Sequence, residues 1–238
     1  MSIATLVLSL ADNKQLLGMR YAEWATRGPS LEADIAAAAM GLDDLGHSRV
    51  LYGCLDHLGQ DAGGRGRERE SDPGGYSNLP YFDRPWTSWA QFVAANAVLD
   101  TAFTAMIQAC VEGNLEVLRS RLRKMLMEER YHFLHARSWL RAGIEEDAVR
   151  TAWREAVEWF GPPEGEVAEL HAAGSLSMGP SELLARLEER LERPAPPLEV
   201  DWSHWDPVRR RCRPGAIDDR TFTMLRGLEE RRFAPARA

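Results

Sequence analysis

Cysteine is scarce in this chain of 238 residues, which has Cys54, Cys110 and Cys212 and no C-x-x-C spacing. An odd number of cysteines offers no disulfide framework, and it is typical of a reducing cytoplasm. Long apolar runs are also missing, since none approaches the roughly 20 residues of a membrane span. The short apolar run near the N-terminus lacks a preceding positive region and soon meets Asp12. It reads as an amphipathic helix rather than a signal peptide, so we expect a cytoplasmic protein without a membrane segment.

An excess of positive charge is absent as well. The net charge is −7 and no basic stripe is interleaved with aromatic residues, which argues against a nucleic-acid partner. Val and Ile are few, whereas Ala, Leu, Glu and Arg dominate, and these residues favour helices. Because a chain of this length can bury one good core, the composition predicts an all-α globular protein.

Four long helical patterns fill the first part of the chain. A crossover loop over 59–82 separates the second from the third, as one class of four-helix bundle requires. Shorter helical patterns follow toward the C-terminus. We therefore predict a single domain over 1–238, with a core bundle over 1–143 and a C-terminal helical extension over 144–238. The expected helices cover 3–27, 31–58, 87–111, 115–142, 145–160, 166–173, 180–192 and 218–233.

The fourth pattern carries a Glu and a His three residues apart, at Glu129 and His132. Residues at this spacing share one helix face, and here that face is apolar. Polar groups in such a stripe cost several kcal/mol unless they are paired, roughly as for other buried polar groups. The second pattern repeats the acid-x-x-His arrangement at Asp44 and His47, which strengthens the interpretation of both as parts of one site.

The first and third patterns each add one acid, Glu23 and Asp100. One carboxylate from each of two helices and an acid-x-x-His from each of the other two form the ligand set of a dimetal-carboxylate bundle. Two iron ions, or manganese, need such hard oxygen ligands and bridging carboxylates. Asp43 and His135 fall off the shared faces and are left out. The predicted metal ligands are Glu23, Asp44, His47, Asp100, Glu129 and His132.

The segments GLDDLGHSRVLYGCLDHLG and LMEERYHFLHARSWLRAG resemble the phenylacetic-acid catabolic proteins, the A and C subunits of bacterial phenylacetyl-CoA epoxidase. The opening LADNKQLLGMRYAEWATRGPSLEADIAAAAMGLD and the stretch RPGAIDDRTFTMLRGLEERRF are most similar to the C subunit. The resemblance implies a ferritin-like four-helix bundle with additional C-terminal helices. It also implies an A subunit that oxygenates the acyl-CoA at a diiron site and a structural C subunit whose site is degenerate. A Gln is common in the C subunit at the place of His47, so this chain has the more complete ligand set.

Three functions stay open from the sequence. The first is a diiron oxygenase, or the oxygenase-type subunit of a multicomponent system, acting on an aromatic acyl-CoA such as phenylacetyl-CoA. It would need electrons from a separate reductase, because no flavin, NAD or iron–sulfur motif is visible. The second is a non-catalytic structural subunit that pairs with a catalytic diiron homologue, in which the acids and histidines would be a vestigial or hydrogen-bonded polar core. The third is a stand-alone dimetal peroxidase or storage protein.

The expected partners are a second copy of the chain or a homologous oxygenase subunit. Apolar helix faces beyond those that one bundle needs are suggested by Trp86, Trp89, Trp139, Trp153 and Trp159. Arg20, one turn before Glu23, is the one cation expected to be able to replace a metal by an ion pair. The basic run 209–211 is interpreted as a solvated surface patch, with contact to CoA phosphates as the alternative.

Overall fold

The computed structural model describes residues 2–59 and 75–233, with side chains described as far as residue 227. Residues 60–74 of the predicted crossover, including its charge run 65–70, lie outside the described residues. Within the described ranges, the β-type pairing is confined to an isolated bridge between Asp206 and Arg211. The all-α prediction is confirmed.

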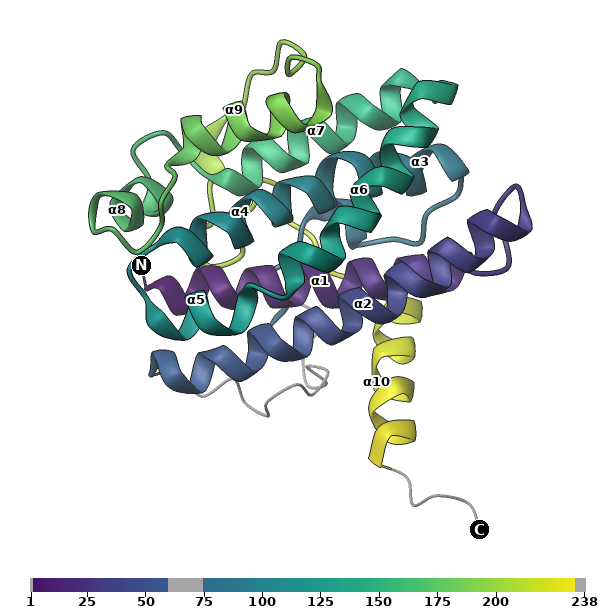
Figure 1. Cartoon of the computed structure of the whole chain (residues 1–238), viewed down its shortest axis with the longest axis horizontal. Coiled ribbons are helices and arrows are strands. Elements are labelled where there is room, and N and C mark those ends of the chain that lie inside the picture. Colours follow the sequence, from purple (N-terminus) through teal and green to yellow (C-terminus); the bar gives the residue numbers. More distant parts are fainter. Residues whose placement is uncertain (1, 60–74, 234–238) are drawn as a thin grey trace.

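The long helices of the bundle run close to the predicted bounds (Figure 1). The first two are α1 (Ile3–Trp24) and α2 (Leu31–Leu55), followed by short 3₁₀ turns η1 (Asp56–Leu58) and η3 (Pro80–Phe82). The third is continuous but changes its winding, through α3 (Trp89–Ala94), the π-helical segment η4 (Ala95–Asp100) and α4 (Thr101–Glu112). The fourth is broken once, between α5 (Glu116–Leu122) and α6 (Met125–Ala142). Together they form a ferritin-like bundle.

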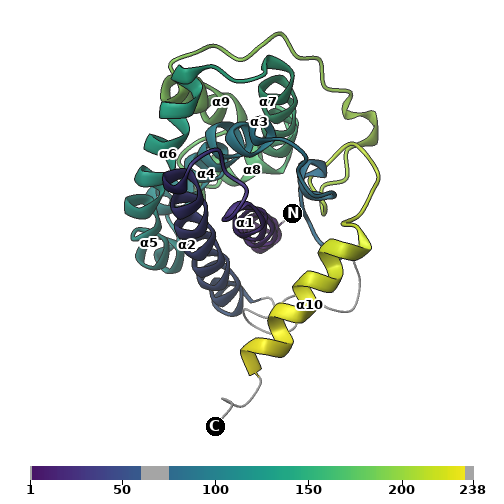
Figure 2. The ribbon, with the colours of Figure 1, turned by 90° about the vertical axis from the view of Figure 1, so that its right-hand side faces the viewer.

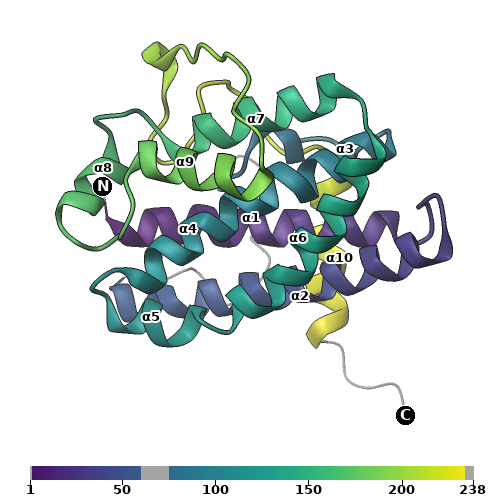
Figure 3. The same cartoon turned by 45° about the horizontal axis from the view of Figure 1, so that its top comes forward.

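The C-terminal helices cover one side of the bundle (Figures 1 and 3). They are α7 (Glu146–Phe160), α8 (Glu166–Ala172) and α9 (Pro180–Leu191), and an extended segment with the 3₁₀ turn η5 (Trp202–His204) then leads to α10 (Asp219–Phe233). Seen along α1, helix α10 crosses beneath the bundle and projects from it (Figure 2). The division into a core bundle and an extension stays a prediction.

Local sequence explains where these helices begin and end. The Ser30 hydroxyl accepts a hydrogen bond from the backbone N–H of Ala33 at the start of α2, which is the usual role of an N-cap serine. Gly143 and Gly161 follow α6 and α7 with positive φ angles of 89° and 90°, a conformation that glycine adopts without steric cost. The helix ends therefore follow from short-range chemistry.

Helix α1 lies inside the protein, and most of its residues are buried on every side. It approaches α2 closely at Gly18, where an added Cβ would meet the Gly41 carbonyl oxygen at 2.9 Å and the Asp44 Cβ at 3.0 Å. Glycines permit such a close approach of two backbones. The contact places Asp44 directly against α1.

The stretch from Trp89 to Glu112 is long and apolar enough to cross a membrane by length and composition, but 89% of its most apolar window is buried inside the protein. It is the core helix of the bundle. Trp86, Trp153 and Trp159 are buried in the chain's own core, so these three tryptophans do not supply the additional apolar helix faces that we expected.

Arginines hold the segment before α10 against the bundle. Arg210 is buried, donates to the Trp159 carbonyl oxygen and lies 5.5 Å from the ring centre of Trp205. Arg211 is paired with Asp83 at 2.6 Å. The prediction of a solvated basic patch is therefore wrong for Arg210 and Arg211, because both guanidinium groups are used inside the fold.

Candidate functional site

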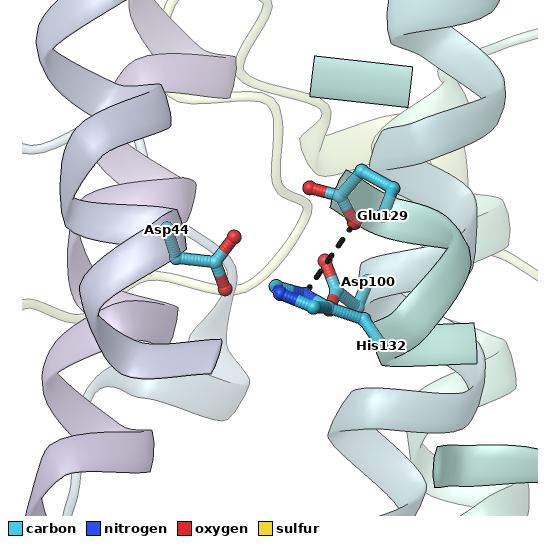
Figure 4. A group of neighbouring side chains, drawn as sticks. All are labelled: Asp44, Asp100, Glu129 and His132. Atoms are coloured by element: carbon cyan, nitrogen blue, oxygen red, sulfur yellow. Dashed lines mark hydrogen bonds and ion pairs between the residues drawn. The ribbon is translucent and has the colours of Figure 1, made fainter. Parts of the chain in front are cut away.

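A buried charged cluster lies where the long helices meet, and the predicted ligands account for most of it. Asp44 reaches from α2 toward Asp100 at the end of η4 and toward Glu129 and His132 on α6 (Figure 4). Their potential ligand atoms all lie within 4.8 Å of one another. All four side chains are buried. This is a donor set that could hold a metal ion.

His47 joins this group from α2. Its Nδ1 lies 2.9 Å from Glu129 Oε1 and 3.5 Å from Asp44 Oδ1. Five of the six predicted ligands thus converge on one small volume. The π-helical segment η4 ends at Asp100, and such segments are frequent at functional sites because they re-aim side chains.

The structure does not bring Glu23 into this group. Its carboxylate accepts a hydrogen bond from Arg20 at 2.8 Å and lies 3.7 Å from Arg220. An α-helix turns about 100° per residue, so Glu23 lies nearly opposite Lys14 on α1. Arg20 is also directed elsewhere, donating to the Phe82 carbonyl oxygen and the Thr221 hydroxyl, and the expectation that it could replace a metal is wrong.

Lys14 is the residue that α1 contributes to the cluster. Its Nζ lies 2.8 Å from Asp44 Oδ1 and 2.5 Å from Glu129 Oε1, and it also contacts Asp100 Oδ1. The side chain is fully buried. The ammonium group therefore stands among the three carboxylates, at the position where a metal would have to contact them.

The cluster balances its own charge when Lys14 and both histidines are protonated. Burial by itself would lower the pKa of Lys14, but Asp100, Asp44 and Glu129 raise this pKa well above its usual value. Burial likewise opposes protonation of His47, yet hydrogen bonds to Asp44 and Glu129 raise its pKa to about 10. Three cations then face three buried carboxylates, so the cluster needs no further positive charge.

The pKa of His132 is also raised well above its usual value, by Glu129 and Asp100 acting against burial. Its Nδ1 lies 2.9 Å from Asp100 Oδ2, and its Nε2 lies 3.4 Å from the half-buried Asp43. His47 repeats this arrangement, with its Nε2 2.9 Å from Glu128 Oε2. Each imidazole thus bridges a buried carboxylate and a carboxylate at the rim.

Four participants in this network are not among the predicted ligands: Lys14, Tyr21, Asp43 and Glu128. The Tyr21 hydroxyl donates to Asp100 Oδ2 at 3.2 Å. Lys14 and Tyr21 are seven residues apart and share a helix face, a spacing that could have revealed them. Asp43 precedes Asp44 on α2 and Glu128 precedes Glu129 on α6. Their histidine partners lie on the other of these two helices, so spacing within one helix does not reveal the pairs.

The residues present do not fit a metal ion together with Lys14. A metal bound by Asp44, Asp100 and Glu129 would have to occupy the space of the ammonium group, and its charge would add to a cluster that is already balanced. Asp44 Oδ2 is a buried oxygen without a hydrogen-bond partner among the described residues, but the other oxygen of the same carboxylate is held by Lys14. In its present form the cluster is an ion-pair network.

The raised histidine pKa values predict how stability depends on pH. A group whose pKa is higher in the folded state stabilises the fold fully below its unfolded pKa, here about 6.5, and the stabilisation is lost as the pH rises toward the folded value. Between pH 7.5 and 8.5 the free energy of unfolding should therefore fall, by at most about 1.4 kcal/mol per pH unit for each histidine. Denaturant unfolding at several pH values measures this slope.

His47→Gln should make this slope shallower, whereas His204→Gln, at an exposed position, should leave it unchanged. A slope that is the same in all three proteins would contradict the assignment of a protonated His47.

Comparison with known proteins agrees with this fold. A sequence model of the family described as "Phenylacetic acid catabolic protein" matches residues 1–209. One curated relative, the C subunit of the 1,2-phenylacetyl-CoA epoxidase of Escherichia coli (strain K12), is 29% identical over 170 residues, which cover 68% of this chain and 68% of the relative. Since the family model spans most of the sequence, the chain belongs to the phenylacetic acid catabolic protein family.

Proposed function

We propose that this chain is a non-catalytic structural subunit, which pairs with a catalytic diiron homologue in a multicomponent oxygenase of aromatic-acid catabolism. The proposal rests on one observation: the Lys14 ammonium group stands among Asp44, Asp100 and Glu129. The substrate of the assembly would be an aromatic acyl-CoA such as phenylacetyl-CoA, in keeping with the name of the relative. The location would be cytoplasmic.

The alternative of a diiron oxygenase draws support from the same donor set, because Asp44, Asp100, Glu129 and His132 have the right chemistry for a metal. It requires Lys14 to leave the cluster, although this side chain is fully buried and paired on a helix whose residues are mostly buried. The predicted diiron centre also needs Glu23, whose carboxylate is held by Arg20. These two features favour the structural role.

An apolar face on α2 and α6 provides a surface for the catalytic partner. Leu42 is 73% exposed and stands beside Asp43, and Tyr131 is 73% exposed and stands beside His132. The two helices are neighbours in the fold. Large apolar side chains exposed together mark interaction sites. The members of this α2–α6 face are Leu31, Ile35, Leu42, Met127, Tyr131 and Leu134.

A homologous bundle is the occupant to which we commit, because the relative is by name one subunit of a larger enzyme. A helix pair of such a homologue would match the α2–α6 face in length and in apolar character. The interface should bury about 1,000 Å² or more, as stable complexes do.

Reconstitution with a catalytic homologue tests the proposal. Leu42→Arg should weaken assembly by about tenfold or more, since a buried charge at an interface costs over about 1.4 kcal/mol; light scattering measures this. Val208→Arg, at an exposed apolar residue away from α2 and α6, is the matched control. The His132→Ala variant should assemble with the catalytic homologue, and each complex should have the same turnover as the complex with the wild-type chain.

Loss of turnover in a fully assembled His132→Ala complex would contradict the non-catalytic role. Equal assembly by the Leu42→Arg and Val208→Arg variants would contradict the proposed surface.

A further inference from the structure

A second polar site lies away from the charged cluster, between α6 and α9. It is a cavity of about 240 Å³, open to solvent and lined by both apolar and charged side chains. We call its apolar lining, Phe133, Leu140 and Leu191, the floor. We call its charged lining the wall, which consists of Arg137, Arg141, Arg190, Glu192 and Arg193.

The wall holds more positive charge than the fold itself neutralises. Arg137 is paired with Glu192 at 2.5 Å, and Arg141 lies 4.0 Å from the same carboxylate. Arg193 is paired with Glu146 at 3.1 Å. Three of the four guanidinium groups thus share two carboxylates, in a chain whose overall charge is negative.

Arg190 is the unneutralised member of the wall. Its side chain makes no hydrogen bond or ion pair with any residue that the structure describes, although it is only partly exposed. It also lines a much smaller cavity beside Asp100, Glu129 and His132. Arg190 therefore lines both cavities and lies between the pocket and the charged cluster.

Glu192 is a carboxylate of the chain itself that already pairs with part of the wall. It has a left-handed backbone conformation, with φ of 53°, which is unusual for a residue other than glycine. In this position its carboxylate lies next to both Arg137 and Arg141. The pocket thus holds one carboxylate near two of its arginines and leaves Arg190 for another anion.

We propose that this pocket binds a small organic phosphate, with the phosphate on Arg190 and its arginine neighbours and the organic group on the apolar floor. Guanidinium groups match phosphate oxygens in a planar, bidentate geometry. A phosphate monoester carries close to two negative charges near neutral pH, which equals the charge that the pocket leaves unbalanced. The proposal does not depend on what the charged cluster holds.

Isothermal titration calorimetry of the full chain with phenyl phosphate and with inorganic phosphate tests this. Phenyl phosphate should bind more tightly than inorganic phosphate, because only the ester contacts Phe133, Leu140 and Leu191. Arg190→Ala should weaken binding of the ester by tenfold or more. Glu192→Gln should strengthen it several-fold, because the substitution removes the internal competitor.

Two control substitutions outside the pocket distinguish specific binding in the pocket from non-specific attraction to surface charge. Glu189→Gln changes a glutamate on α9 that is paired with Arg186, outside the pocket, and should leave the affinity unchanged. Arg154→Ala removes an arginine on α7 and should likewise have no effect. Equal affinity for the two phosphates, or equal weakening by Arg190→Ala and Arg154→Ala, would overturn the proposal.

Discussion

Lys14→Met is expected to lower the free energy of unfolding at pH 7.5 by about 3–5 kcal/mol, because removing one member of a buried ion-pair network leaves buried charge uncompensated. Lys14 contacts three carboxylates. Methionine fills a similar volume, so the loss reports charge rather than a cavity. Denaturant unfolding measures it.

The charge balance predicts which second substitution restores stability. Burial and the neighbouring Asp44 and Glu129 raise the pKa of Asp100, so in Lys14→Met this carboxyl should be the first to take up a proton. Combining Lys14→Met with Asp100→Asn removes one cation and this anion, and should recover most of the loss. Lys124→Met, which breaks an exposed pair with Glu128, should cost under about 1 kcal/mol.

A Lys14→Met protein as stable as the wild type would contradict the ion-pair interpretation. If the single variant fails to fold, the double variant still decides the question, because the charge argument requires it to be folded and a packing argument does not.

Lys14→Ala is expected to create a divalent-metal site, which we expect the wild type to lack. The substitution vacates the space of the ammonium group and leaves Asp44, Asp100, Glu129 and His132, whose ligand atoms lie within 4.8 Å of one another. A metal that binds only the folded state stabilises it, by about 2.7 kcal/mol at a free concentration of 100 times Kd. Thermal unfolding with and without Co²⁺, together with visible absorption of bound cobalt, measures the gain.

The wild type and a Lys14→Ala/His132→Ala double variant are the controls for this experiment, and neither should show the cobalt-dependent shift. A Lys14→Ala protein that gains no stability at millimolar Co²⁺ would show that lysine is not what excludes the metal.

The sequence predicted the helices well because their ends depend on neighbouring residues. Ser30 begins α2, and Gly143 and Gly161 end α6 and α7. The acid-x-x-His pairs on α2 and α6 were also found, because those helices have one buried face on which a polar residue stands out.

The contribution of α1 could not be found in the same way. A helix that is buried on all sides has no solvent-exposed polar face, so its sequence does not show which face points to the core. Helix α1 buries Asp12, Asn13, Lys14 and Arg20 alike. Asp12 and Asn13 are used to hold the backbone of Ser77 and Leu79. Which polar residue faces the cluster depends on the close contact between Gly18 and α2, a tertiary feature that helical spacing alone does not contain.

Metal analysis of the wild-type chain, purified from cells grown with ample iron and manganese, tests the central claim most directly. If the Lys14 ammonium group is the cation of the cluster, the protein should contain neither metal in stoichiometric amount, and its thermal unfolding should not change when Fe²⁺ is added without oxygen. Stoichiometric iron or manganese that is lost in the His132→Ala variant would contradict the account.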